Sequence, residues 1–124
     1  MTLVEAMKRH GDVKVSYTPT VATAHHEAGN ALEPGDLFIT LGAGNVHEAG
    51  KRISEDLKVL EEILRLVPAG EMAGKLYEPM RRHTTMLAGG PAQFWLEPHT
   101  FQAFAEAVTY CRERGMAVRV VGRG

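Results

Sequence analysis

The sequence is poor in cysteine, in aromatic residues and in long apolar runs. Its single cysteine, Cys111, cannot form a disulfide within the chain, which fits a reducing compartment. No apolar run approaches the ~18 residues that a membrane-spanning helix needs. The N-terminus also lacks the charged-then-apolar pattern of a signal peptide. We therefore expect a cytoplasmic protein with no membrane partner.

Neither sign of charge dominates the chain. The net charge is -1, with 8 basic and 11 acidic residues in 1–75 and 6 and 4 in 76–124. Neither part has the dense basic patch that is typical of a nucleic-acid-binding protein. Hydrophobic residues make up 44% of the 124 residues, an ordinary share for a globular domain. The composition predicts a globular protein without a nucleic-acid partner.

The apolar residues recur with spacings that predict alternating helices and strands. Strands that alternate with helices favour an α/β fold built from right-handed parallel units. Helical spacing predicts helices around Leu3–Met7, over Val21–Leu32, after the turn at Gly42–Asn45, from Ser54 to Val67 and after Thr100. Short apolar or alternating runs predict strands at 13–17, 37–41, 84–86, 93–96 and 117–121.

The helix after Thr100 is expected to bury one apolar face. Cys111 lies on that face and is interpreted as a small core residue rather than a nucleophile. The face consists of Phe101, Phe104, Ala105, Val108 and Cys111.

Between Pro68 and Pro79 the composition changes to glycine, alanine, glutamate and lysine without a sustained period. Such a stretch is typical of a linker. The sequence therefore predicts one unit over residues 1–67, a linker over 68–80 and a second unit over 81–124.

Three glycine clusters could bind a ligand. Gly42-Ala43-Gly44 lies between a predicted strand and helix, but His47 stands where a dinucleotide fingerprint has its third glycine. We interpret it as a tight turn with Asn45 capping the helix. Gly89-Gly90-Pro91 fits equally a simple bend or a close approach of backbone to a flat ligand. Gly122-Arg123-Gly124 follows a predicted strand and could cradle a phosphate, with Arg123 as a charge partner.

No catalytic or metal-binding group emerges from the residue pattern. His25 and His26 are adjacent on a predicted helix, where side chains diverge by ~100°, so a packing or surface role is favoured over a shared metal ion. His47 and His83 lack a paired carboxylate at a telling spacing, so we assign neither an acid-base role. The glycine turn at the end of the chain is typical of a motif that continues. We therefore expect the chain to be part of a longer polypeptide.

Residues 83–124 resemble the start of UDP-N-acetylenolpyruvoylglucosamine reductase, also called UDP-N-acetylmuramate dehydrogenase. The resemblance rests on Thr84-Thr85, on Gly89-Gly90-Pro91-Ala92 and on Val120-Val121-Gly122-Arg123-Gly124. Met86 and Ala88 depart from the family, which often has an aromatic and a β-branched residue there.

Residues 1–66 resemble the C-terminal end of UDP-N-acetylmuramate:L-alanine ligase. Tyr17, Pro34-Gly35-Asp36-Leu37 and Leu41-Gly42-Ala43-Gly44-Asn45-Val46 carry this resemblance. Together the two resemblances imply the junction of a fused ligase-reductase polypeptide of peptidoglycan-precursor synthesis.

The reductase resemblance implies an FAD-binding α+β domain of the vanillyl-alcohol-oxidase type. In that family the flavin takes a hydride from NADPH and reduces the enolpyruvyl group of a UDP-linked amino sugar, with a serine as the acid. The resemblance places the cofactor near Thr85, Gly89 and Gly90. It places the flavin pyrophosphate around Val121, Gly122, Arg123 and Gly124. No catalytic residue of the family maps onto this chain.

The ligase resemblance implies a Rossmann-like C-terminal domain of an enzyme that uses ATP and Mg²⁺. Its phosphate loop and metal site would lie upstream of Met1. We therefore expect the 124 residues alone to be inactive. Two alternatives stay open: a non-catalytic α/β nucleotide-binding module, or a flavin oxidoreductase of the same fold with another substrate.

Overall fold

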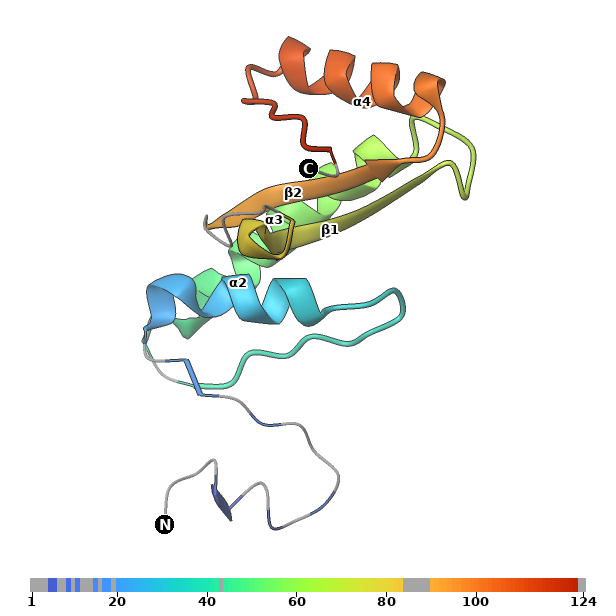
Figure 1. Ribbon diagram of the computed structural model, residues 1–124. Helices are drawn as coiled ribbons and strands as arrows, with labels where there is room; N and C mark the ends of the chain where they lie inside the picture. Colours follow the sequence, from blue (N-terminus) through green and yellow to red (C-terminus); the bar gives the residue numbers. More distant parts are fainter. Residues whose placement is uncertain are drawn as a thin grey trace.

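The computed structural model describes residues 5–6, 9, 11, 15, 17–18, 20–42, 44–83 and 90–122. The predicted N-terminal helix and the predicted strands at 13–17 and 84–86 fall largely or wholly outside these residues. No helix in the described ranges is long and apolar enough to cross a membrane. The elements, in chain order, are α2 (Val21–Ala31), α3 (Val46–Leu64), β1 (Met72–Pro79), the 3-10 helix η1 (Met80–Arg82), β2 (Pro91–Pro98) and α4 (Phe101–Glu113) (Figure 1).

The chain is α/β, as predicted, but its sheet differs from the expected one. In the described part of the chain the sheet has two strands, β1 and β2, and they are antiparallel. The register runs from Met72 opposite Pro98 to Pro79 opposite Pro91. The parallel units expected from the alternation of helices and strands are not found in these residues. The spacing predicted the types of several elements correctly but not how the strands pair.

The helices predicted within the described residues are confirmed, except that those expected after Gly42–Asn45 and from Ser54 to Val67 form one helix, α3, which ends at Leu64. α2 covers the expected Val21–Leu32 span to within one residue, and α3 begins directly after the Gly42–Asn45 turn. α4 begins after Thr100, whose hydroxyl accepts a hydrogen bond from the Ala103 N–H at 3.0 Å. This bond satisfies one of the backbone donors that a helix leaves free at its first turn.

Two predicted strands are wrong. Residues 37–41 and 117–121 lie in coil, and their apolar side chains are largely exposed, with Leu41 at 87% and Val120 at 71%. A strand needs a neighbour for its backbone hydrogen bonds. In the described part of the chain no strand pairs with either segment. The runs are apolar, as the sequence pattern indicated, but no strand among the described residues pairs with them.

Residues 72–79, inside the predicted linker over 68–80, form the strand β1, which the sequence patterns did not indicate. Its exposed and buried positions do not simply alternate, because Leu76, Tyr77 and Glu78 are buried in succession. Because three buried residues follow one another, the strand lacks the regular alternation by which strands are recognised in a sequence. The division of the chain into two units remains a prediction.

Two apolar clusters form the core on the helix-covered side of the hairpin. One contains Ile53, Leu60, Leu76 and Tyr77, with Ala28, Leu32 and Phe94 packed against it. The other joins the end of α3 and the start of β1 to α4. Its buried members are Ile63, Val67, Met72, Ala103, Ala107, Tyr110 and Cys111.

The buried face of α4 differs from the predicted one. Cys111 is buried, as predicted, but Phe101 is 84% exposed. The small side chains of Ala103 and Ala107 face the core instead. Residues four apart on a helix share a face, so this alanine pair lets α4 pack closely against its neighbours. The predicted face was chosen from the larger apolar residues, and it is rotated about the helix axis relative to the face that is buried.

Candidate functional site

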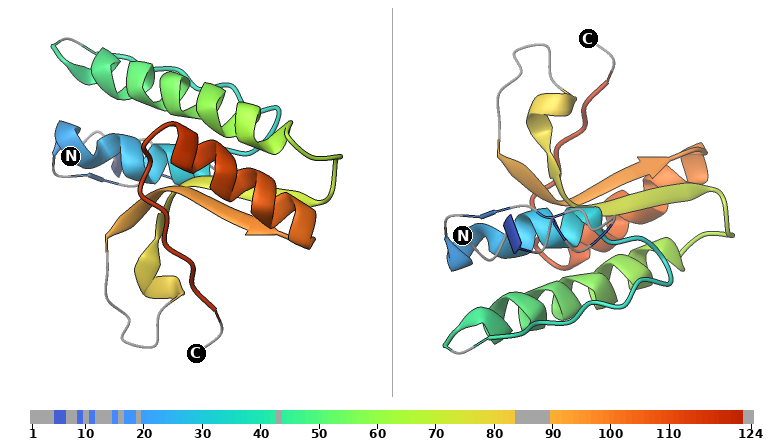
Figure 2. Two further views of the ribbon diagram at one scale, coloured as in Figure 1. Left: turned by 90° about the horizontal axis from the view of Figure 1, so that it is seen from above. Right: turned by 90° about the horizontal axis from the view of Figure 1, so that it is seen from below.

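The residues predicted to bind a cofactor are only partly described. Thr85, Gly89, Arg123 and Gly124 lie outside the described residues. Gly90, Val121 and Gly122 are exposed, and apart from its two neighbours in the chain no residue has an atom within 4 Å of the position that a Cβ would take at either glycine. In both views of Figure 2 the terminal coil runs on the same side of the molecule as η1. Open backbone on one side of the molecule fits the approach of a flat ligand.

The two ends of the segment between His83 and Gly90 are held by backbone hydrogen bonds. The Met80 N–H donates to the Gly90 carbonyl at 3.1 Å. The His83 N–H donates to the Met80 carbonyl at 2.9 Å, which closes the η1 turn. Gly90 is therefore anchored just before β2, and the space that a side chain would occupy at this position is open.

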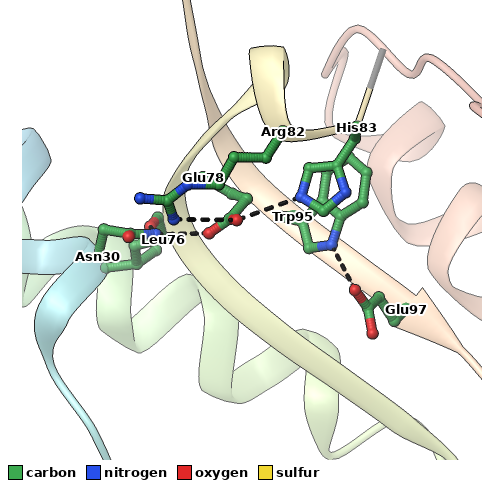
Figure 3. A network of polar contacts seen from close by, with 7 residues as sticks. All are labelled: Asn30, Leu76, Glu78, Arg82, His83, Trp95 and Glu97. Atoms are coloured by element: carbon green, nitrogen blue, oxygen red, sulfur yellow. Dashed lines mark hydrogen bonds and ion pairs between the residues drawn. The ribbon is translucent and has the colours of Figure 1, made fainter. Parts of the chain in front are cut away.

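A buried carboxylate, Glu78, fixes this turn to the rest of the molecule (Figure 3). The Asn30 amide donates to Glu78 Oε2 at 2.7 Å and to the Leu76 carbonyl at 3.0 Å. On the other oxygen, Arg82 Nη1 lies 3.4 Å and His83 Nε2 3.2 Å from Oε1. Burial alone would raise the pKa of Glu78, but these hydrogen bonds outweigh it and lower the pKa below its usual value.

His83 also stacks on Trp95 from the neighbouring strand. The ring centroids are 3.8 Å apart with 19° between the planes, and the indole N–H donates to Glu97 at 2.9 Å. The sequence shows no carboxylate at a telling spacing from His83, but the fold brings Glu78, five residues earlier on β1, to its ring. Sequence spacing alone missed the pair since it depends on the bend that η1 introduces. These contacts hold η1 against β1 and β2.

A second polar cluster surrounds Tyr77. This residue has a φ of 54°, which is rare outside glycine, and its hydroxyl donates to the Asp56 carboxylate on α3. Gln93 donates to the same carboxylate at 3.0 Å. Burial and then the bond to Asp56 raise the pKa of Tyr77. The cluster borders a cavity of about 230 Å³ lined by His25, His26, Arg52, Asp56, Tyr77, Pro91 and Gln93.

The two adjacent histidines serve packing, one of the roles that the sequence favoured. His25 is buried and meets the Tyr77 ring edge-on, with centroids 5.1 Å apart. The His26 ring lies 5.2 Å from the same ring. Within the described ranges no group of three potential ligands could hold a metal ion.

The Gly42–Gly44 loop behaves as a turn. Both glycines have positive φ, 149° and 87°, which a side chain would strain. Asn45 stands at the N-cap of α3 but its side chain makes no capping hydrogen bond, so that part of the prediction was wrong. His47 Nδ1 lies 3.1 Å from the Gly44 carbonyl and closes the turn instead.

The chain matches curated proteins of two kinds. It is 42% identical over 53 residues to the UDP-N-acetylmuramate–L-alanine ligase of Desulfotalea psychrophila, covering 43% of this chain and 12% of the relative. It is 43% identical over 60 residues to the UDP-N-acetylenolpyruvoylglucosamine reductase of Rubrobacter xylanophilus, covering 48% and 19%. For the reductase of Desulforamulus reducens the identity is 38% over 50 residues, covering 40% and 16%.

No family model and no solved structure matches the chain. The chain spans less than a fifth of the length of these relatives. The ligase and reductase matches cover different parts of it, which confirms the resemblance found in the sequence. The chain thus joins a part similar to UDP-N-acetylmuramate–L-alanine ligases to a part similar to UDP-N-acetylenolpyruvoylglucosamine reductases, as the junction of the two enzymes would.

Proposed function

We propose that this chain is the junction of a bifunctional peptidoglycan-precursor enzyme. In this proposal residues 1–67 end a UDP-N-acetylmuramate–L-alanine ligase with a Rossmann-like domain. Residues 81–124 open the FAD-binding domain of a UDP-N-acetylenolpyruvoylglucosamine reductase. The observation that carries the proposal is the pair of matches on different parts of one chain. The parent enzyme acts in the cytoplasm on UDP-linked amino sugars.

FAD, reduced by NADPH, supplies the hydride that converts UDP-N-acetylenolpyruvoylglucosamine to UDP-N-acetylmuramate, and the ligase part uses ATP and Mg²⁺. In this proposal the residues of this chain help to bind and orient the FAD cofactor. The exposed backbone at Gly90 and Gly122 supports a cofactor role, because both positions leave space where a side chain would stand. The contacts of Glu78 with Asn30, Arg82 and His83 would support the cofactor site, because they fix η1, the turn that precedes Thr85 in the sequence. We expect no activity from the 124 residues alone.

Flavin titration tests the proposal. FAD is added to the purified 124-residue chain and to the polypeptide extended through the downstream reading frame, while flavin fluorescence and absorbance are followed. The account expects saturable binding by the extended polypeptide. Absence of binding by both would contradict it and favour a non-flavin nucleotide-binding module. Reduction by NADPH with another acceptor but not with the enolpyruvyl sugar would instead favour a flavin enzyme of different specificity.

A further inference from the structure

The region between the two proposed units is a packed interface. The cluster around Ile53 and Leu60 of α3 also contains Leu76 and Tyr77 of β1. Ala28 and Leu32, at and just after the C-terminal half of α2, pack against it as well. The helices of the ligase-like part and the hairpin thus share one core.

Shape complementarity adds to this burial. Gly29 of α2 faces the Tyr77 ring, and a Cβ at position 29 would lie 2.5 Å from ring atom Cδ2. No side chain fits in that space, so glycine allows the ring to lie directly against the helix backbone. The ring is held there by its hydroxyl, which donates to Asp56 of α3.

Polar contacts cross the same interface in two places. Asn30 of α2 donates to the Leu76 carbonyl at 3.0 Å and to Glu78 at 2.7 Å. Gln93 of β2 donates to Asp56 of α3 at 3.0 Å. A buried carboxylate that loses its donors is strongly destabilised, so such contacts fix one arrangement of the two sides.

We infer that α2 and α3 bind the β1–β2 hairpin as a rigid joint that holds the ligase-like and reductase-like units in one fixed orientation. The inference rests on the proposed function for the identity of the two units. The rigidity of the joint rests only on the contacts above. A flexible linker would let each unit move and unfold by itself, whereas a shared core makes the two sides unfold together.

Urea unfolding followed by two probes tests the joint. Trp95 on β2 is the only tryptophan, so its fluorescence reports the hairpin, while circular dichroism at 222 nm reports the helices. The variant is Asn30→Ala, which removes both bonds to β1. The matched control is Asn45→Ala, whose side chain is exposed and makes no capping bond.

The inference expects the two transitions of the unmodified chain to coincide. In Asn30→Ala both midpoints should fall together, by about 0.5 M urea, and the control should shift neither. Separate transitions in the unmodified chain, or a fall of the helical midpoint with an unchanged Trp95 midpoint, would overturn the inference.

A distance measurement gives a second readout that leaves the contacts of Asn30 and Tyr77 in place. Spin labels are placed on the exposed positions Thr23 of α2 and Thr109 of α4, in a Cys111→Ala background. A rigid joint gives one narrow distance distribution, and a broad one would overturn the inference. Neither experiment involves FAD, so failure of the flavin titration leaves both interpretable.

Discussion

The Tyr77 ring lies against the backbone of Gly29, two residues that are far apart in the sequence and belong to β1 and α2. Tyr77 is the one non-glycine residue with positive φ in the described part of the chain. Such a conformation costs of order 1 to 3 kcal/mol and persists only where the surroundings enforce it. The space left by Gly29 and the bond to Asp56 are those surroundings.

Gly29→Ala tests this contact through the sign of its effect. In an ordinary helix interior the change stabilises by about 1 kcal/mol, because alanine favours the helix. Here the new methyl group would overlap the Tyr77 ring. We expect a net loss of about 1 to 3 kcal/mol in the free energy of unfolding, measured by urea denaturation.

Gly50→Ala is the matched control for that variant. Gly50 also lies within a helix, α3, but its Cβ would meet mainly the end of the Thr40 side chain, at 3.0 Å. Thr40 can move because it belongs to a coil segment. The control should be neutral or stabilising. An equal gain in both variants would contradict the account of Gly29.

Tyr77→Phe should lower the free energy of unfolding by about 1 to 2 kcal/mol, because Asp56 loses a hydrogen bond from the phenol. Tyr17→Phe, at a residue that is 76% exposed, should change stability little.

The parent protein and Tyr77→Phe should also differ in how their stability changes at alkaline pH. The pKa of Tyr77 is raised in the folded state, so its contribution is complete below pH 10 and is lost as pH rises further. Equal alkaline slopes in the parent and Tyr77→Phe would argue against this role.

Acid should weaken the fold through Glu78. Its pKa is lowered in the folded state, so its contribution is present above the ordinary value of 4.5 and is lost as pH falls through the folded pKa. Urea denaturation between pH 3 and 7 measures this effect. Glu78→Gln should lower stability at pH 7 by about 1 kcal/mol or more and flatten the acid slope. Glu106→Gln on α4 is the comparison, and a parent-like acid slope in Glu78→Gln would count against the network.

Gly122→Val tests the proposed cofactor contact in the extended polypeptide. A branched side chain would occupy the open space at this backbone position. We expect FAD affinity to fall about tenfold or more, which corresponds to about 1.4 kcal/mol. Thr109→Val, which introduces the same side chain at an exposed position of α4, should leave affinity within a factor of two. Unchanged affinity in Gly122→Val would remove Gly122 from the cofactor site.

Sequence patterns predicted α2, α3 and α4 well because each depends on the local spacing of apolar residues and on local start signals. α2 and α4 have clear starts at Thr20 and Thr100, and the turn before α3 has glycines that require positive φ. β2 covers the predicted 93–96 strand for the same reason, since apolar residues and prolines delimit it.

The errors arose where structure depends on distant partners. The runs at 37–41 and 117–121 are apolar enough for strands, but among the described residues no neighbour pairs with them. β1 was missed because an acidic residue, Glu78, is buried in it through contacts with Asn30 on α2. The Tyr77 cluster was missed too, because nothing local indicates that Gly29 and Asp56 meet one tyrosine.

The most direct test of the central claim uses the polypeptide encoded by the whole reading frame. It is purified and given UDP-N-acetylenolpyruvoylglucosamine, NADPH, ATP, Mg²⁺ and L-alanine, and the products are identified by mass spectrometry. The account predicts that one polypeptide oxidises NADPH and forms UDP-N-acetylmuramate linked to L-alanine. Formation of neither the reduced sugar nor its alanine adduct would contradict the claim that this chain joins the two enzymes.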